Sequence, residues 1–269
     1  LKLGSCSLLM SVLREAIGVV GNQYDIDSLN IGKIVVGLAY IGVMFTDGEV
    51  GICSNLIAES NPHCCDIIDE AGRFTDIPVR RLLAYTTSWN FFERALGVAT
   101  LNALSQKIII QNPEDYPMLR GNLINVLDVE PGERVSLVGM IRPFIPTLEE
   151  KAKELYILER GSPRPQGVYP DTACEELLPL SDVVVITGSA IANGTLDRLL
   201  ELSTNARTVA VVGPTASMVP DPLFSRGVDY CGGIQVKNPE LLMKILSEAG
   251  GTPHMRGKAV DFVTYLAPE

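Results

Sequence analysis

The chain has 269 residues, of which 46% are hydrophobic and 20% charged, a composition typical of a well-packed protein with one large domain or two modest ones. Its formal net charge of −10 and its lack of a lysine–arginine cluster argue against nucleic acid as a partner, because the phosphate backbone is bound by cations. No apolar run approaches the roughly 20 residues of a membrane span, so no membrane partner is expected.

The six cysteines have neither a Cys-x-x-Cys spacing nor the pattern of a small disulfide framework. They are Cys6, Cys53, Cys64, Cys65, Cys174 and Cys231. This usage indicates reduced thiols, and we expect a cytoplasmic protein. Because the sequence begins with Leu1 rather than Met, a lost leader is left open.

The N-terminal third predicts a helix followed by antiparallel strands. Ser5 or Ser7 can start the helix. A glycine-rich apolar segment, residues 33–45, precedes a turn at Asp47–Gly48, and residues 49–57 would form the returning strand.

A short helix over residues 78–85 and a long one over residues 88–107 should follow. The long helix is apolar on most faces, beginning with Trp89, which indicates burial. Asn102 lies in an apolar row and needs a hydrogen-bond partner, either within the core or in a ligand site. Residues 111–121 are expected to connect this part to the next.

From residue 134 the pattern alternates between strand and helix. The predicted strands are residues 134–138, 156–158, 183–186, 209–212, 230–236 and 259–266, and the predicted helices are 148–155, 171–180, 196–203 and 239–249. Such alternation implies right-handed crossovers and a Rossmann-like parallel sheet, so the fold class is α/β.

Two polar loops follow neighbouring predicted strands. The first contains Thr187, Gly188, Ser189, Asn193 and Thr195, and the second Gly213, Pro214 and Thr215. In open α/β sheets, ligands bind beyond the carboxyl ends of the strands. Backbone N–H groups around glycines can also hold an anion. The sequence therefore predicts a ligand crevice here.

Gly139 ends the first strand of this region, and Glu159 lies 20 residues further on. This arrangement is similar to the strand, glycine turn and ribose-binding acid of dinucleotide and adenosylmethionine sites. The turn at residues 139–144 lacks the remaining glycines of the dinucleotide fingerprint, so a standard NAD site is disfavoured. Glu159 either faces the crevice or is a solvated loop acid.

Catalytic and metal-binding patterns are sparse. The two histidines, His63 and His254, lie far apart, so nothing supports a Ser-His-Asp triad. Residues 63–66 (His-Cys-Cys-Asp) contain metal-ligand types, but adjacent residues rarely converge on one ion, and local metal binding is the minor alternative. Cys231 beside two glycines is expected in the core rather than as a nucleophile.

The C-terminal half resembles a family of uncharacterised prokaryotic proteins described as "putative heavy-metal chelation". The resemblance is carried by VGMIRPF at residues 138–144, by Glu159, by YPDTACEELLPLSDVVVITGSAIANGTLDRLL at 169–200 and by VVGPTASMVPDPLFSRGVDYCGGIQV at 211–236. In the N-terminal half, GLAY at residues 37–40 and ALGVATLNAL at 95–104 resemble the domain that usually precedes it. The resemblance implies an enolase N-terminal-like α+β domain, residues 1–120, and a Rossmann-like domain, residues 121–269, with an active site between them.

Our leading hypothesis is that this cleft binds a small polar ligand, such as a metal-chelating metabolite or its chelate. The candidate ligand-binding residues are Gly139, Phe144, Glu159, Thr187, Gly188, Ser189, Asn193, Thr195, Gly213, Pro214, Thr215 and Asn102. The alternatives are an enzyme using a nucleotide-like cofactor such as adenosylmethionine, and a metal carrier without catalysis. Apolar, glycine-rich strands make a homodimer plausible.

Overall fold

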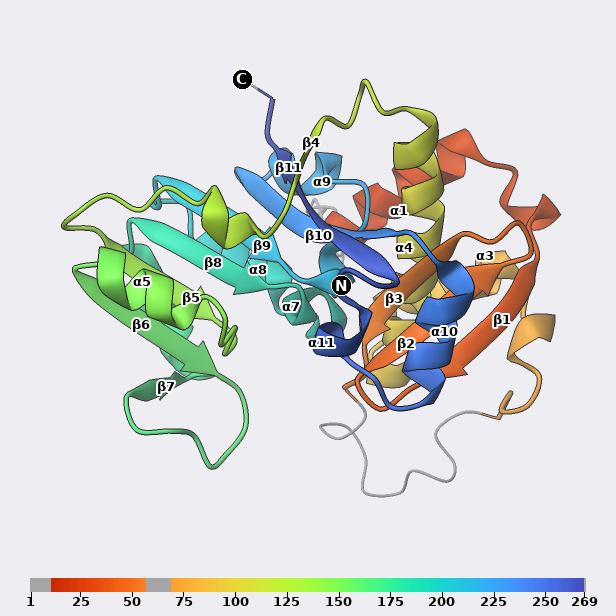
Figure 1. The fold of residues 1–269 in the computed structure, drawn as a ribbon, viewed down its shortest axis with the longest axis horizontal. Helices are drawn as coiled ribbons and strands as arrows, with labels where there is room; N and C mark the ends of the chain where they lie inside the picture. Colours follow the sequence, from red (N-terminus) through yellow and green to blue (C-terminus); the bar gives the residue numbers. More distant parts are fainter. Residues whose placement is uncertain (1–10, 57–68, 269) are drawn as a thin grey trace, which may run out of the picture.

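The computed structural model describes residues 11–56 and 69–268, which form a three-stranded and an eight-stranded sheet (Figure 1). The expected helix starts Ser5 and Ser7, and the expected loop at residues 61–66, lie outside the described residues. Helix α1 (Val12–Gln23) follows Ser11, whose hydroxyl accepts a hydrogen bond from the Arg14 N–H. Helical turn η1 (Ile26–Ser28) leads to the first sheet.

The small sheet is an antiparallel meander of β1 (Ile31–Val36), β2 (Tyr40–Phe45) and β3 (Val50–Ser54). The predicted single segment at residues 33–45 is in fact two strands, because a tight turn closes where the Gly37 N–H donates to the Tyr40 carbonyl. The predicted turn at Asp47–Gly48 is confirmed, and Gly48 has a φ of +96°.

Helix α4 (Phe91–Gln111) lies against this sheet, after η3 (Phe74–Asp76), α3 (Val79–Ala84) and η4 (Tyr85–Thr87). Asn90 caps α4 by accepting hydrogen bonds from the Phe92 and Glu93 N–H groups. The prediction that Trp89 belongs to the buried helix is wrong, because Trp89 precedes the capping residue Asn90 and is 92% exposed. A Cβ on Gly51 would lie 2.1 Å from Ala103 N, so β3 and α4 are in direct backbone contact.

The large sheet has the order β4-β11-β10-β9-β8-β5-β6-β7. Its strands are β4 (Met118–Arg120), β5 (Arg134–Val138), β6 (Glu154–Glu159), β7 (Val168–Pro170), β8 (Val183–Thr187), β9 (Thr208–Val212), β10 (Tyr230–Val236) and β11 (Val260–Leu266). Between β10 and β7 in this order, each strand runs parallel to its neighbours. In chain order these six strands are arranged 3-2-1-4-5-6, the order of the doubly wound dinucleotide fold. The α/β fold class is therefore confirmed.

Short helices connect the strands of the large sheet. They are η5 (Leu123–Asn125), α5 (Ile145–Lys151), η6 (Asp171–Ala173), α6 (Cys174–Leu177), η7 (Leu178–Leu180), α7 (Ser189–Asn193), α8 (Leu196–Leu202), η8 (Pro214–Ala216), α9 (Asp221–Phe224), α10 (Pro239–Ser247) and α11 (Thr252–Met255). The predicted helix at 148–155 starts and ends earlier, because the chain is already extended at Ala152. The predicted helix at 171–180 is three successive short turns, the last containing Pro179.

Helix α10 covers the face of the small sheet opposite α4 (Figure 1). Leu242, Met243 and Leu246 of α10 pack with Val35 and Ile52 of the small sheet. The glycine-rich strands, on which the homodimer prediction rests, are thus covered by two helices, and that prediction stays untested.

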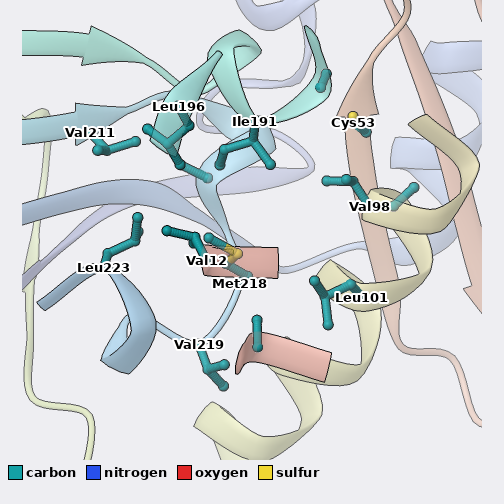
Figure 2. Close-up of a cluster of buried hydrophobic side chains, with 14 of the residues drawn as sticks. Val12, Cys53, Val98, Leu101, Ile191, Leu196, Val211, Met218, Val219 and Leu223 are labelled. Carbon is teal, nitrogen blue, oxygen red and sulfur yellow. The ribbon is translucent and has the colours of Figure 1, made fainter. Parts of the chain in front are cut away.

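One hydrophobic core joins the two sheets. Val98 and Leu101 of α4 share a buried cluster with Ile191 of α7, Met218 and Leu223, as Figure 2 shows. No helix in the described part of the chain combines the length and apolar character that crossing a membrane requires.

Candidate functional site

The topology places a crevice between the carboxyl ends of β5 and β8. These strands are neighbours, with Val138 paired to Ile186. From this point β5 leads to β6 on one side and β8 leads to β9 on the other, which defines a topological switch point. Ligands of open α/β folds bind at such points. Two adjoining cavities lie here, and Met140, Ile141 and Thr187 line both.

The first cavity, of about 620 Å³, lies over the ends of β5, β6 and β8. This volume falls within the range of small-molecule sites. Its polar and charged lining comprises Glu159, Arg160, Asp171, Thr172, Glu175, Thr187, Ser189, Asn193, Thr195 and Arg198. Leu56, which follows β3 of the small sheet, also lines it, so the wall combines residues that follow strands of both sheets.

Glu159 lies at the end of β6 and holds the turn after β5. Its Oε2 accepts a hydrogen bond from the Met140 N–H at 2.5 Å, and its Oε1 accepts one from the Arg160 N–H at 3.0 Å. A carboxylate has about four acceptor positions, so each oxygen can still bind a ligand hydroxyl or cation. Gly139 has a φ of +90°, and a Cβ there would lie 2.6 Å from Thr187 Cγ2. This position therefore requires glycine.

The hydroxyl and amide groups after β8 lie on a short helix rather than a loop. The predicted loop at residues 187–195 is wrong for residues 189–193, which form α7. Asn193 Oδ1 accepts hydrogen bonds from the N–H (3.0 Å) and the hydroxyl (2.7 Å) of Thr195. The Asn193 Nδ2 group has no hydrogen-bond partner among the described residues, so it can donate into the cavity.

Arg94 of α4 supports the turn between α7 and α8. The turn passes through Gly194, which has a φ of +78°, and a Cβ there would lie 1.9 Å from Arg94 Nη1. Arg94 is 7% exposed and its Nε donates to the Ser88 carbonyl at 2.8 Å. Burial lowers the pKa of Arg94, and no carboxylate of the described residues pairs with it. A buried cation thus lies behind the wall that carries Asn193 and Thr195.

The outer rim of the first cavity contains paired charges. Arg198 binds Glu175 through Nε (3.0 Å) and Nη2 (2.6 Å), and Arg160 Nε lies 3.4 Å from Asp171 Oδ2. Burial raises the pKa of the Cys174 thiol, and the charges of Glu175 and Asp171 raise it further. Cys174 therefore stays protonated at neutral pH and is not an activated nucleophile.

The second cavity, of about 570 Å³, lies beside the end of β9, the middle of β10 and the turn that follows β5. Its lining is largely apolar and includes Leu123, Pro143, Phe144, Pro214, Pro253, Phe262 and Val263. Arg142 and Arg256 are the charged residues among its described lining. Tyr40 of the small sheet closes one side, and its hydroxyl lies 2.7 Å from Thr252 Oγ1.

The predicted residues separate into three groups. Gly139, Glu159, Thr187, Ser189, Asn193 and Thr195 line the first cavity, and Phe144, Gly213, Pro214 and again Thr187 line the second. Gly188, Thr215 and Asn102 line neither among the described residues. Asn102 and Thr215 lie where the small sheet and α4 meet the turn after β9, a contact that we call the seam. Gly188 packs against the same turn, since a Cβ there would lie 3.0 Å from Ala216 N.

At the seam, most polar groups bind other protein groups, whereas the buried Asn102 Oδ1 has no hydrogen-bond partner among the described residues. Asn102 is fully buried, and its Nδ2 donates to the carbonyls of Ile52 (2.8 Å) and Thr215 (2.9 Å). Thr215 Oγ1 accepts the Ser54 N–H at 2.9 Å, and Ser54 Oγ lies 3.1 Å from Ser189 Oγ. Ser54 thus connects the seam to the first cavity.

Sequence reasoning missed Ser54, Leu56, Tyr40, the two arginines of the second cavity and the rim charges. Arg142, Asp171 and Glu175 lie within stretches that carry the family resemblance, but none of the three was predicted to bind a ligand. Arg256 gives no local signal. Residues 63–66, the minor metal-binding candidate, lie outside the described residues. Within residues 11–56 and 69–268, no group of three His, Cys, Asp or Glu side chains is placed to hold a metal ion.

The fold and crevice define a class of two-sheet α/β proteins with a Rossmann-like sheet, and comparisons with known proteins agree. Two family models, both described as "Putative heavy-metal chelation", match residues 122–263 and 22–105. The chain belongs to this family. An uncharacterized protein of Methanocaldococcus jannaschii is 30% identical over 221 residues, which cover 79% of this chain and 80% of that protein.

Two solved structures of proteins with unknown function from the same family share the fold. The one from Desulfitobacterium hafniense has a TM-score of 0.75 and 26% identity, covering 94% of this chain and 98% of that one. The one from Pyrococcus horikoshii has a TM-score of 0.81 and 24% identity, covering 95% and 100%.

Proposed function

We propose that the first cavity binds a small polar organic ligand, and that this ligand is a metal chelator carried with its metal as cargo. The observation that carries the proposal is that Glu159, at the end of β6, and Thr187 and Asn193, at the end of β8 and on the helix after it, line one cavity at the switch point. Hydroxyl, amide and carboxylate groups are the donors and acceptors that fix the orientation of a polar ligand.

The size of the cavity supports an organic ligand rather than a bare ion. A volume of about 620 Å³ accommodates a small metabolite, whereas an ion bound by protein side chains needs only a close shell of ligands. The family description supplies the metal, and a chelating ligand would supply most of its coordination. Glu159 would then bind either a ligand hydroxyl or the positive charge of the chelate.

Native mass spectrometry with elemental analysis, on protein purified without chelator, tests the proposal. We expect a retained organic ligand or metal–ligand adduct in the parent. Thr187→Val and Asn193→Leu should each lower its occupancy at least about ten-fold, because each removes a polar contact at the centre of the cavity.

Thr204→Val serves as the control. Thr204 is exposed, follows α8 and lies outside both cavities. The proposal is wrong if the parent retains neither ligand nor adduct, or if the two cavity variants retain as much as the control.

An enzyme that uses a nucleotide-like cofactor such as adenosylmethionine is the second candidate. The strand order 3-2-1-4-5-6 and the place of Glu159 at the end of the strand beside β5 favour it. Saturating adenosylmethionine, NAD or ATP should raise the melting temperature if one of them binds the folded chain. No shift with any of the three would reject this candidate.

We also propose a division into domains of residues 1–120 and 121–269. The separate family matches support it. Strand β4 crosses this division, because Met118–Arg120 pairs with β11 of the large sheet.

A further inference from the structure

The two cavities differ in charge. The described lining of the first contains three carboxylates (Glu159, Asp171, Glu175) and two guanidinium groups (Arg160, Arg198). The described lining of the second contains two guanidinium groups and no carboxylate. In a chain with a net charge of −10, a cavity lined by one positive sign is a local exception, and its low-dielectric walls concentrate the field.

Neither arginine of the second cavity is neutralised by a neighbour. Arg142 and Arg256 are exposed, and no carboxylate of the described residues forms an ion pair with either. Asp261 lies outside the second cavity and lines a neighbouring one together with Arg256, where it is already bound by Lys237 at 3.0 Å and Arg120 at 3.4 Å. Positively charged side chains therefore outnumber carboxylates around Arg256.

The remaining lining of the second cavity is largely apolar and contains the flat faces of aromatic and proline rings. Phe144 is buried and Phe262 lies under Arg256, whose Cζ is 5.2 Å from the ring centroid. Pro143, Pro214 and Pro253 complete the surface. An apolar surface beside two guanidinium groups is complementary to an aromatic ring that bears an anionic group.

We propose that the second cavity binds an aromatic ring bearing a carboxylate or phosphate. This inference rests on the proposed function, since the ring would be one end of the ligand whose polar end occupies the first cavity. The shared lining residues Met140, Ile141 and Thr187 make the two cavities continuous enough for one molecule to occupy both.

Isothermal titration calorimetry with benzoate, phenyl phosphate and benzyl alcohol tests the inference on the full chain. These probes share the ring and differ in the charged group. We expect millimolar binding of at least one anion and at least about ten-fold weaker binding of benzyl alcohol, because charge-assisted hydrogen bonds are the stronger ones. The tighter anion identifies the group as carboxylate or phosphate.

Arg142→Gln and Arg256→Gln should each weaken binding of that anion about five- to ten-fold and leave benzyl alcohol unchanged. Both side chains are exposed, so the variants should fold. Arg164→Gln is the matched control, because Arg164 is exposed, lies outside both cavities and carries the same charge.

The inference is overturned if benzyl alcohol binds as tightly as the anions, if no anion binds at millimolar concentration, or if the arginine variants match the control. Its failure is distinguishable from failure of the proposed function. If the arginine variants lose anion binding while Thr187→Val retains the ligand, the inference stands and the proposed function fails. If Thr187→Val loses the ligand while the arginine variants still bind the anion, only the assignment of the first cavity stands.

Discussion

The seam and the crevice contain similar residues but use them differently. At the seam, Asn102 and Thr215 are buried and bind protein groups. In the crevice, Thr187 and Asn193 are half-buried and line a cavity. Both regions follow the ends of parallel strands, so position along a strand does not decide the role of a polar side chain. The presence of a covering element does: α4 and β3 pack on the turn η8, which carries Thr215, whereas Thr187 and Asn193 border a cavity.

This difference predicts that seam substitutions lower stability and that crevice substitutions lower ligand binding. Unfolding in urea, followed by circular dichroism, is the suitable measurement. Trp89 is the one tryptophan of the chain and is 92% exposed, so its fluorescence should report unfolding poorly.

Gly51→Ala should have the largest effect. Its Cβ would lie 2.1 Å from Ala103 N and 2.2 Å from the Ala99 carbonyl oxygen, so α4 would have to move away from β3. We expect a loss of about 3 kcal/mol or more in the free energy of unfolding. Gly18→Ala is the control of opposite sign: it lies on the exposed face of α1 with open space around it, and should gain about 0.5–1 kcal/mol. A tolerated Gly51→Ala would refute the backbone contact.

Asn102→Ala should cost about 2–4 kcal/mol, because it leaves the buried carbonyls of Ile52 and Thr215 without their donor. Asn112→Ala, which removes one half-buried hydrogen bond to Ile108 at the end of α4, should cost about 1 kcal/mol or less. Equal losses in the two variants would contradict the seam as described.

Gly194→Ala should lower both stability and ligand binding, since Gly194 belongs to the crevice wall and contacts Arg94. The positive φ and the contact with the guanidinium should together cost about 1–2 kcal/mol. We also expect lower ligand retention in native mass spectrometry, because Asn193 and Thr195 would shift. Unchanged retention in a folded variant would show that the turn does not position these side chains.

The smallest effect is expected from Glu15→Gln, at the contact between α1 and α9. Hydrogen bonds from Arg226 hold the pKa of Glu15 below its ordinary value of 4.5. The folded state therefore binds this proton less tightly than the unfolded state, and the pair stabilises the fold above pH 4.5 and loses its effect as the pH falls further. The side chain is 31% exposed, so we expect at most about 1 kcal/mol. The difference in the free energy of unfolding between Glu15→Gln and the parent should vanish in acid. A difference that does not change with pH would indicate a packing effect instead.

Much of the fold was predictable because β8 and β9 are apolar runs rich in β-branched residues, whose burial on both faces follows from their composition. Strands β4 and β7 have three residues each and give no periodic signal. Helix α7 was missed for the same reason: five residues between two glycines make little more than one turn.

The candidate site was predictable only in part. Glu159 and Thr187 end strands β6 and β8 and border a cavity, whereas α4 covers the turn that carries Thr215, and the sequence does not contain that distinction. Arg142 and Arg256 line the same cavity because β11 returns beside β10. This strand is antiparallel, a direction that the alternating pattern of strands and helices did not predict.

A crystal structure of the protein purified without chelator tests the central claim most directly. The account predicts density for an organic ligand at the carboxyl ends of β5 and β8, in contact with Glu159, Thr187 and Asn193. A retained ligand bound anywhere else on the chain, with no ligand density between these strand ends, would contradict it.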